Sequence, residues 1–378
     1  MRYFGQIVRP VHGEACLSIG IAAALCRITD GLADRVAGAV VTNYRDFVHT
    51  TRSTALLSRS DRFGAHTIEE GYRPGTLEMA QRTYRPSTME RALRTLSPEK
   101  PIPISEGLGA SFIGRSLGGA RTVYKPSYLE SLMMPATAYP ACYPLRYGIP
   151  RGYGQHAARE NATYRVDEAL GFGLVPPTTL VEKGPYGPGS NQQWVLSSPG
   201  HAKVAWLRRP SKEREASFTR WQESKSEEER AAIYEEWLRP NKKYPEVQRE
   251  RMAVLDYVIG NTDRHWGNYR TGRDGELVAI DHSLTFPTTP DSRYGIRSDF
   301  VREFHNKELS KEVLDSVRAI DPHQLRTALR DTGLGDDAIE GALDRLREIS
   351  THGRITGEKW SGEIRGAREN QVAKWILT

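Results

Sequence analysis

The order of strand-like and helix-like segments constrains the fold of this chain more than any other feature of its sequence. From Pro101 onward, short apolar runs alternate with Pro and Gly, and Gly118-Gly119 separates Ala110–Ile113 from Thr122–Tyr124. Paired glycines supply the positive φ of a tight hairpin turn, so this segment predicts a β-hairpin that ends at Lys125-Pro126. Helical patterns dominate the later part of the chain. A strand-rich lobe before a helix-rich lobe predicts an α+β, two-lobed fold.

This order divides the chain into three expected regions. Residues 1–100 form an N-terminal accessory region of unknown role, in which Ser87 and Glu90 have the spacing of a capping box. Residues 101–206 form the strand-rich lobe, and residues 207–378 form the helical lobe with a charged helical insertion at about 210–243. Within the lobes we expect helices at 157–170, 247–259, 311–320, 322–331 and 336–349, and strands at 174–181, 192–197 and 277–280.

The charge pattern argues against a nucleic-acid partner. The net charge is only +6 over 378 residues, and charges alternate in sign, as in Lys212-Glu213-Arg214-Glu215. A nucleic-acid binder instead concentrates its basic residues on one face. Three cysteines, Cys16, Cys26 and Cys142, cannot all pair and lack metal-ligand spacing. The cysteine pattern favours a reducing, cytoplasmic location.

The most apolar run, Cys16–Cys26, is much shorter than the roughly 20 residues of a membrane-spanning helix. Arg2 and Arg9 precede it, as in a secretory signal, but Glu14 interrupts the approach and no clean cleavage site follows. We therefore expect a buried helix or strand here. The sequence also shows no polybasic cluster or palmitoylation-type cysteine cluster, and stable attachment normally needs two such signals, so we expect no stable membrane anchoring.

Residues 259–287 carry the clearest chemistry. A short loop after a helix holds Asp263 and Asn268, and Asp281 follows the apolar strand of a hairpin that turns at Arg273-Asp274-Gly275. Phosphoryl transfer needs a carboxylate that orients the attacking hydroxyl, and an amide oxygen and a second carboxylate that hold Mg²⁺ against nucleotide phosphates. Asn268 lies five residues after Asp263, and Asp281 lies eighteen residues after Asp263. This is the spacing of a kinase catalytic loop and its metal-binding aspartate.

Two other readings of these residues stay open. Asp263 and Asn268 could cap the preceding helix, because both residue types bond readily to nearby backbone. His265 and His282 could bind Zn²⁺ together with the two aspartates, although no zinc motif such as H-E-x-x-H accompanies them.

The motifs N-T-D-R-H-W-G-N and A-I-D-H-S-L-T-F-P resemble the catalytic loop and metal-binding motif of the phosphatidylinositol 3-/4-kinase superfamily. They look most like its type II phosphatidylinositol 4-kinase branch and the bacterial and plant protein-kinase-like relatives of that branch. Upstream segments resemble the branch in the same order: a glycine-rich loop through Lys125, a helix with Arg159-Glu160, and a strand with Gln192. The resemblance covers about residues 101–350 and implies a protein-kinase-like fold.

The resemblance also implies roles for individual residues. Lys125 would contact the ATP phosphates and pair with Glu160, and Asp263 would be the catalytic aspartate. Asn268 and Asp281 would bind Mg²⁺, with Mn²⁺ as an alternative metal. The residues implied to shape the catalytic loop or touch the γ-phosphate are Arg264 and His265. The remaining implied nucleotide contacts are Gly107, Gly109, Ser111 and Gln192. The glycine loop reads G-L-G-A-S-F-I-G rather than G-x-G-x-x-G, and such a loop alone is a weak signal.

The sequence therefore predicts an ATP- and Mg²⁺-dependent kinase that phosphorylates a hydroxyl of a protein or a small soluble acceptor. Between Leu284 and Glu303, three arginines are offset by three acidic residues. An enzyme that docks on an anionic bilayer should display a basic surface there, so protein Ser/Thr is favoured over an inositol lipid. The alternatives are a phosphatidylinositol 4-kinase, a kinase-fold enzyme that transfers the nucleotide moiety, and a non-catalytic pseudokinase scaffold.

Overall fold

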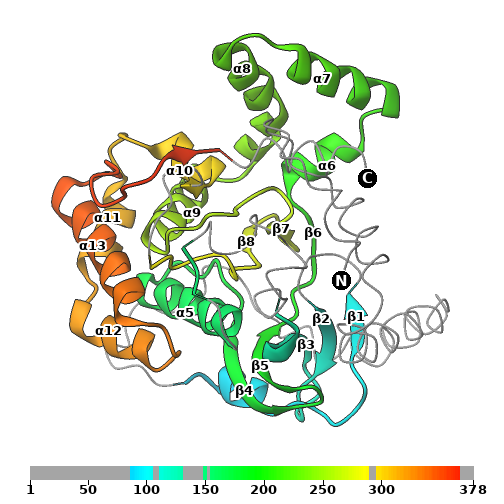
Figure 1. The fold of residues 1–378 in the computed structure, drawn as a ribbon, viewed down its shortest axis with the longest axis vertical. Coiled ribbons are helices and arrows are strands. Elements are labelled where there is room, and N and C mark those ends of the chain that lie inside the picture. The colour runs from blue at the N-terminus through cyan, green and yellow to red at the C-terminus, as the bar shows by residue number, and fades with distance from the viewer. Residues whose placement is uncertain (1–85, 105–109, 131–147, 151–153, 289–294, 367–378) are drawn as a thin grey trace, which may run out of the picture. The chain divides into compact units, whose positions relative to one another are not determined.

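A five-stranded antiparallel sheet forms the strand-rich lobe, with strand order β1-β2-β3-β5-β4 (Figure 1). The computed structural model describes residues 86–104, 110–130, 148–150, 154–288 and 295–366, which all belong to one unit of the chain. The predicted apolar segment Cys16–Cys26 and the predicted nucleotide contacts Gly107 and Gly109 lie outside these ranges. The strands of the sheet are β1 (Ile102–Ile104), β2 (Ser111–Arg115), β3 (Arg121–Pro126), β4 (Thr178–Gly184) and β5 (Gly187–Gln193).

The predicted hairpin is confirmed as β2 and β3. Ile113 pairs with Val123, and the two strands run antiparallel. The turn between them places Gly119 at a φ of 86°, a left-handed conformation that glycine adopts without the steric penalty of a side chain. The second strand of the hairpin ends at Pro126, so Lys125 is the second-last residue of β3.

One face of this sheet is buried against an apolar cluster made by Leu96, Phe112, Tyr124 and Val181. Helix α4 (Thr88–Leu93) adjoins this face, because Asn191 of β5 donates from Nδ2 to the carbonyl oxygen of Leu93 at 2.8 Å. The capping box predicted for Ser87 and Glu90 is present at the start of α4. Residues 87–96 therefore pack against the strand-rich lobe, although they precede its predicted start at residue 101.

Two strand predictions need correction. The expected strand at 192–197 is wrong in its bounds, because β5 ends at Gln193 and the next strand, β6 (Ser197–Pro199), belongs to another sheet. Gly-rich β5 is a strand because β3 and β4 pair with both of its edges. The strand expected from residue 174 begins only at Thr178, since Pro176-Pro177 has no N–H to donate to a ladder.

Helix α5 (Gln155–Leu170) carries the predicted Glu160 and ends as expected at Gly171, whose φ is 66°. Glu130 accepts hydrogen bonds from the backbone N–H groups of His156 and Ala157, at 3.1 and 2.9 Å. These bonds satisfy two of the donors that a helix leaves free in its first turn. The η1 turn (Ser127–Leu129) that precedes Glu130 follows β3 directly, so the end of β3 and the start of α5 are linked.

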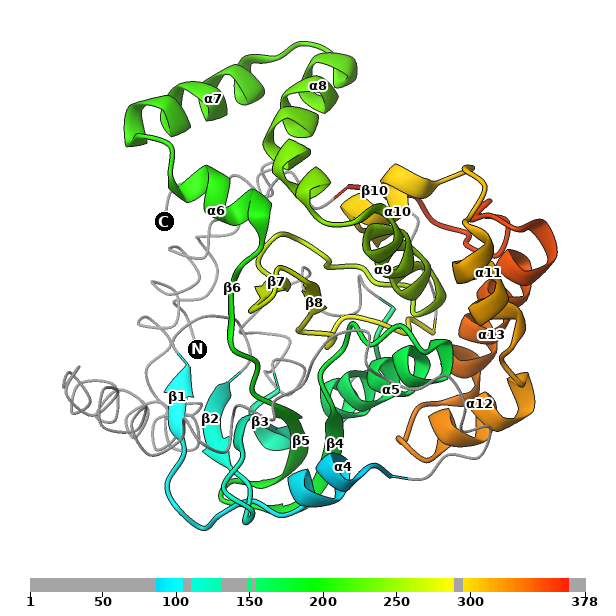
Figure 2. The ribbon, with the colours of Figure 1, turned by 180° about the vertical axis from the view of Figure 1, so that it is seen from behind.

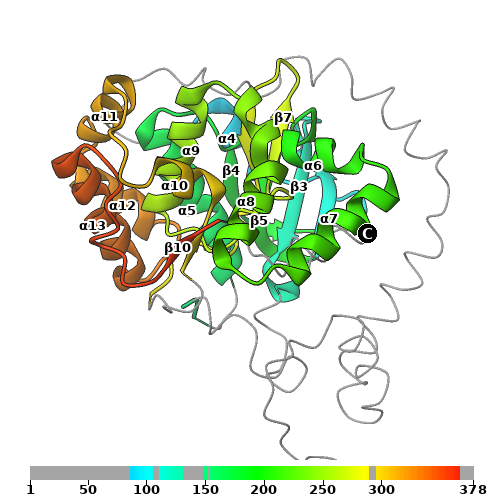
Figure 3. The same cartoon turned by 90° about the horizontal axis from the view of Figure 1, so that it is seen from above.

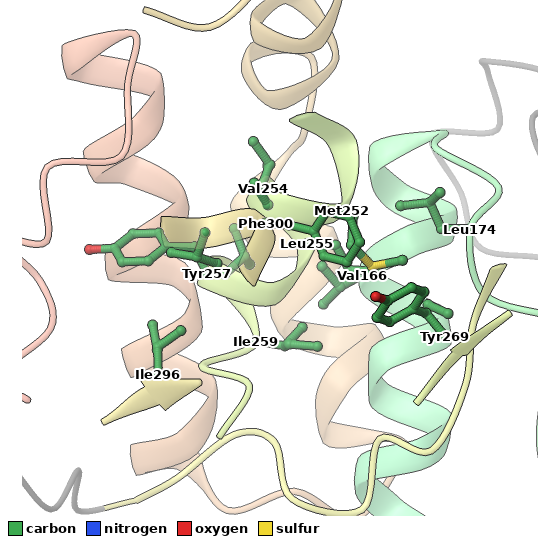
Figure 4. Packing of buried hydrophobic residues seen from close by; sticks show 14 of the residues in the cluster. Val166, Leu174, Met252, Val254, Leu255, Tyr257, Ile259, Tyr269, Ile296 and Phe300 are labelled. Atoms are coloured by element: carbon green, nitrogen blue, oxygen red, sulfur yellow. The ribbon is translucent and has the colours of Figure 1, made fainter. Parts of the chain in front are cut away.

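The helical lobe surrounds α9 (Glu246–Val258), in which six apolar side chains between Met252 and Val258 are completely buried. Figure 4 shows Met252, Leu255 and Tyr257 of this helix among Val166, Leu174, Tyr269 and Phe300. The helices expected at 247–259, 311–320, 322–331 and 336–349 are confirmed with small shifts at their ends. The helices after α9 are α10 (Asp299–Phe304), α11 (Lys311–Arg318), α12 (Pro322–Arg330) and α13 (Asp336–His352).

The expected insertion is helical and projects from the rest of the lobe (Figures 1 and 2). Figure 3 views it from above. Its apolar stripe, Trp221, Ile233 and Trp237, is buried, while most of its charged side chains stay exposed. The insertion and its base consist of α6 (His201–Leu207), α7 (Ser211–Glu223), α8 (Glu227–Leu238) and the η4 turn (Arg239–Lys243).

The expected hairpin after α9 is also present. Strands β7 (Tyr269–Gly272) and β8 (Leu277–Ala279) run antiparallel and form a three-stranded sheet with β6. A short parallel pair, β9 (Ile296–Arg297) and β10 (Ile364–Arg365), lies beyond them. The α+β class, with a strand-rich lobe before a helical lobe, is confirmed. None of the described helices combines the length and apolarity that a membrane span would need.

Candidate active site

Lys125 joins three segments that are far apart in sequence. Its Nζ donates to Glu160 Oε1 at 2.5 Å and to Asp281 Oδ1 at 3.0 Å. Lys125 comes from β3, Glu160 from α5, and Asp281 from the segment after β8. Burial acts to lower the pKa of Lys125, but the negative charges of Asp281 and Glu160 outweigh it and raise that pKa above its ordinary value. The lysine is therefore a permanent positive charge at the junction of the two lobes.

The register of the sheet places the predicted nucleotide contacts on β2, β3 and β5 on one face. Val123 lies opposite Ile113 on β2 and opposite Gln192 on β5. Directly opposed residues share a face, as do residues two apart along a strand. Ser111, Lys125 and Gln192 therefore share the face opposite the buried Phe112–Tyr124 cluster. The residues of this face on β2 and β3 are half-buried, so Ile113 and Val123 provide apolar surface beside Lys125.

The loop after α9 holds Asp263 and Asn268 together. Asn268 Nδ2 donates to the backbone oxygen of Asp263 at 2.9 Å, and the Asp263 N–H donates to Asn261 Oδ1 at 2.9 Å. His265 lies in the same loop, with its Nδ1 accepting from the Gly267 N–H at 2.9 Å. Burial lowers the pKa of His265, which favours a neutral ring at pH 7. These bonds close the loop and leave the Asp263 side chain 16% exposed.

Arg264 lies at 0% exposure beneath this loop and does not reach the surface of the site. Its Nε donates to Asp256 Oδ1 on α9 at 3.0 Å. Its Nη1 donates to the backbone oxygens of Asn268 and Ile280, at 2.5 and 2.8 Å. One guanidinium therefore fixes the positions of the helix, the catalytic-loop candidate and the residue before Asp281. Of the two roles implied for Arg264, this geometry is compatible with shaping the loop.

Asp281 has an unusual backbone, with a φ of 57°. Non-glycine residues in this left-handed region are uncommon and concentrate at functional sites. Ser283 Oγ donates to Asp281 Oδ1 at 3.2 Å, and the side chain is 42% exposed. Desolvation acts to raise the pKa of Asp281, but the charge of Lys125 outweighs it and lowers that pKa. Asp281 is therefore an ionised and accessible carboxylate.

The oxygen atoms of Asn268 and Asp281 fit a Mg²⁺ ion in chemical type. Mg²⁺ prefers oxygen ligands and often takes only one or two carboxylates, with substrate phosphates and water completing its shell. Asn268 uses its Nδ2 toward Asp263, and no donor in the described part of the chain bonds to its Oδ1. The backbone N–H of Ile280 donates to the backbone carbonyl oxygen of Asn268 at 3.1 Å, which holds the two candidate ligands in adjacent segments.

The zinc alternative finds no support in the same region. Across residues 154–288 and the other described ranges, no group of three or more His, Cys, Asp or Glu side chains could hold a metal. His282 is completely buried, and its Nδ1 lies 3.4 Å from Glu160 Oε2. This histidine therefore backs the lysine–glutamate pair instead of facing a metal beside His265.

Two further buried residues hold the segments of the site together. The sequence singled out Arg159 only as the neighbour of Glu160, and it did not single out Asp256. Arg159 is buried, and its Nε donates to the backbone oxygen of Thr285 at 2.8 Å. It therefore ties α5 to the segment that follows Asp281. Asp256 accepts from Arg264, Asn261 and Ser298. The sequence predicted neither set of contacts, because each residue bonds to elements that are distant along the chain.

Comparisons with known proteins show what this chain is similar to. Residues 154–332 match the family model of phosphatidylinositol 3- and 4-kinase. The chain is 26% identical over 275 residues to phosphatidylinositol 4-kinase gamma 3 of Arabidopsis thaliana, covering 66% of this chain and 43% of that protein. It is 24% identical over 308 residues to phosphatidylinositol 4-kinase gamma 7 of the same plant, covering 74% and 42%. The matched region thus spans less than half of these relatives.

Among solved structures, the chain is similar to the Golgi casein kinase with Mn/ADP bound. The TM-score is 0.43 at 15% sequence identity, and the match covers 72% of this chain and 75% of that one. The family match includes α5 with Glu160, the Asp263 loop and Asp281. Over these residues the chain is therefore similar to the phosphatidylinositol 3- and 4-kinase family.

Proposed function

We propose that this protein is an ATP- and Mg²⁺-dependent kinase that transfers the γ-phosphate to a hydroxyl acceptor. The observation that carries the proposal is the contact of Lys125 with both Glu160 and Asp281. It joins a cationic group on the sheet face to an exposed carboxylate beside the Asp263 loop. Phosphoryl transfer depends chiefly on positioning and on charge stabilisation, and this arrangement supplies both.

Each group has a role in the proposed reaction. Lys125, held by Glu160, binds the α/β-phosphates as a point charge. Asn268 and Asp281 hold Mg²⁺, which neutralises phosphate charge when bound. Asp263 orients the acceptor hydroxyl and takes its proton. The acceptor oxygen forms a bond to the γ-phosphorus, the bond from that phosphorus to the bridging oxygen breaks, and ADP leaves.

Metal-dependent nucleotide binding is the first expected result. ATP with Mg²⁺ should stabilise the protein by RT ln(1 + [L]/Kd), about 2.7 kcal/mol at a hundredfold excess over Kd, and ATP with EDTA should do much less. Asp281→Asn should remove most of this difference, because it removes a charged ligand. Asp274→Asn, at the exposed tip of the β7–β8 hairpin, changes the net charge equally. This control should keep the difference between the shifts with Mg²⁺ and with EDTA. Thermal melts with and without metal measure both variants, and an equal shift in wild type under both conditions would contradict the metal roles.

The labelled position of ATP identifies the reaction. A kinase transfers label from the γ-phosphate, whereas an enzyme that transfers the nucleotide moiety carries over label from the α-phosphate. A non-catalytic scaffold transfers neither. Mass spectrometry after incubation with ATP and Mg²⁺ would show the same distinction by the added mass.

For the acceptor, we propose a protein Ser/Thr hydroxyl in preference to an inositol lipid. The arginines after Asp281 are engaged by acidic neighbours where the structure describes them. Arg297 Nη2 lies 3.8 Å from Glu363 Oε2, and Arg302 Nη2 lies 3.5 Å from Glu235 Oε1. These charges are therefore partly neutralised before any anionic bilayer could attract them.

The acceptor preference predicts a rate difference. The protein should phosphorylate itself or a generic basic protein faster than it phosphorylates phosphatidylinositol in vesicles. Parallel assays with the same labelled ATP would measure both rates. Abundant lipid product without labelled protein would reverse the preference while leaving the kinase proposal intact.

A further inference from the structure

A cavity of about 780 Å³ lies at the base of the helical insertion, where α6, α8 and the η4 turn meet β6. None of the candidate catalytic, nucleotide or metal residues lines it. The position of α6 below the projecting α7 and α8 can be followed in Figures 1 and 2. The charged residues of its lining are Arg208, Arg209, Glu236, Arg239 and Lys243.

The lining has a large excess of positive charge. Its single carboxylate, Glu236, pairs with Arg209 at 3.1 Å. The other three cations, Arg208, Arg239 and Lys243, form no ion pair with an acidic side chain in the described part of the chain. Like charges that share a concave surface raise the local potential and attract anions. The cavity therefore gathers three uncompensated positive charges around one space.

The walls of the cavity are held in place by contacts outside it. His201, Val204 and Ala205 line it from one face of α6, and Arg208 extends this face at the C-cap, since their spacing of three and four residues repeats with the helical turn. Behind this face, Trp206 packs edge-on against Trp237 of α8, with ring centroids 5.3 Å apart. The insertion is therefore fastened to α6, and the cavity does not need a ligand to bring its walls together.

The base of the cavity is fixed through α6 as well. The Ala202 N–H donates to Asn241 Oδ1 of the η4 turn at 3.2 Å, and the His201 N–H donates to the Tyr244 hydroxyl at 3.0 Å. Arg239 and Lys243 thus keep a set position relative to Arg208. A preformed site loses less conformational entropy on binding than a flexible one.

We propose that this basic cavity binds a small molecule that carries two or more phosphate groups. Arginine binds phosphate through two parallel N–H···O bonds, and lysine adds a point charge. The volume falls within the roughly 300–1,000 Å³ of small-ligand sites and exceeds what a single inorganic phosphate fills. Val204 and Ala205 add an apolar wall that can contact the carbon part of such a ligand. The site is separate from the proposed ATP site, and its occupancy does not depend on catalysis.

Inorganic pyrophosphate in EDTA is a suitable probe, because the proposed catalytic metal is then absent. Isothermal titration calorimetry should show binding to wild type and at least about tenfold weaker binding to Arg208→Gln/Arg239→Gln, as loss of charge-assisted bonds predicts. The matched control is Lys212→Gln/Lys225→Gln, which removes two exposed positive charges of the same insertion outside the cavity. This control should keep nearly the full affinity.

Vesicle sedimentation distinguishes a soluble ligand from a lipid headgroup. The vesicles contain phosphatidylcholine with a minor fraction of phosphatidylinositol 4-phosphate, and pure phosphatidylcholine is the reference. Loss of vesicle binding in the cavity variant, but not in the lysine control, would assign the site to a lipid-borne phosphate. Cavity-dependent binding of pyrophosphate without vesicle binding would assign it to a soluble ligand. Absence of binding to both probes, or equal losses in the two variants, would overturn the proposal. Unchanged ATP–Mg²⁺ thermal shifts in both variants would verify that they are folded.

Discussion

Asp263→Asn is expected to reduce phosphoryl transfer by at least about a hundredfold, since general base catalysis contributes factors of about 10²–10⁴. The asparagine side chain cannot take the proton of the acceptor hydroxyl. The backbone oxygen of Asp263, which accepts the 2.9 Å bond from Asn268, is unchanged by the substitution. The ATP–Mg²⁺ thermal shift should therefore stay close to that of wild type. Initial rates with γ-labelled ATP, together with thermal melts, measure both properties.

Asp274→Asn serves as the control for this experiment, because it makes the same chemical change at an exposed hairpin position. It should keep wild-type turnover. Full turnover by Asp263→Asn would show that the loop after α9 does not supply the base. Loss of nucleotide binding along with turnover would instead assign Asp263 to the nucleotide.

Arg264→Met is expected to destabilise the protein by about 3–5 kcal/mol, the range for removing one partner of a buried ion pair. Arg264 and Asp256 are both completely buried. Without the guanidinium, the Asp256 carboxylate would keep only the neutral donors Asn261 and Ser298. The backbone oxygens of Asn268 and Ile280 would also lose a donor. Chemical denaturation, with its midpoint and slope, gives the free energy of unfolding.

Two further substitutions test the reason for this loss. Arg264→Lys keeps the charge but lacks the planar fork that reaches several acceptors at once, so its stability should be intermediate. Arg347→Met removes an exposed arginine that pairs with Asp344 within one helix, and such pairs contribute about 0–1 kcal/mol. If Arg264→Met and Arg347→Met had similar stabilities, the buried arginine would not be the link between α9 and the site.

Local structure near the site was predictable from short stretches of sequence. Gly118-Gly119 turns the β2–β3 hairpin, and the Arg273-Asp274-Gly275 turn joins β7 to β8. Gly171 ends α5 in a left-handed conformation. In each case the deciding energy comes from the backbone preferences of one or two residues, and those preferences act within a few positions along the chain.

The bounds of β5 were not predictable in this way. Its sequence, GPGSNQQ, has no β-branched or aromatic residue, yet it forms a central strand. Hydrogen bonds to β3 and β4 on both edges hold it there, and tertiary context of this kind routinely overrides β-propensity. Tyr124 and Val181 of those neighbouring strands also bury apolar surface on one side of the sheet.

The positive charge of the basic cavity was also not predictable from the linear sequence. Along the sequence, Arg208 and Arg239 are about thirty residues apart and are separated by many acidic residues, so no basic cluster is visible. The two helices between them project outward and return, which brings both arginines to one cavity. Electrostatic interactions depend on distance in space, and the linear pattern of charges does not contain that distance.

The sequence by itself determined the order of the lobes, the turns, most helices, and the residue types of the candidate site with their spacing. These properties follow from side-chain patterns and from backbone preferences within a few residues. Only the tertiary structure decided that Lys125 contacts Glu160 and Asp281 at once, and that Arg264 is a buried link and not a surface ligand. Such contacts join β3, α5, α9 and the segment after β8, and they form only when apolar burial has packed these elements together.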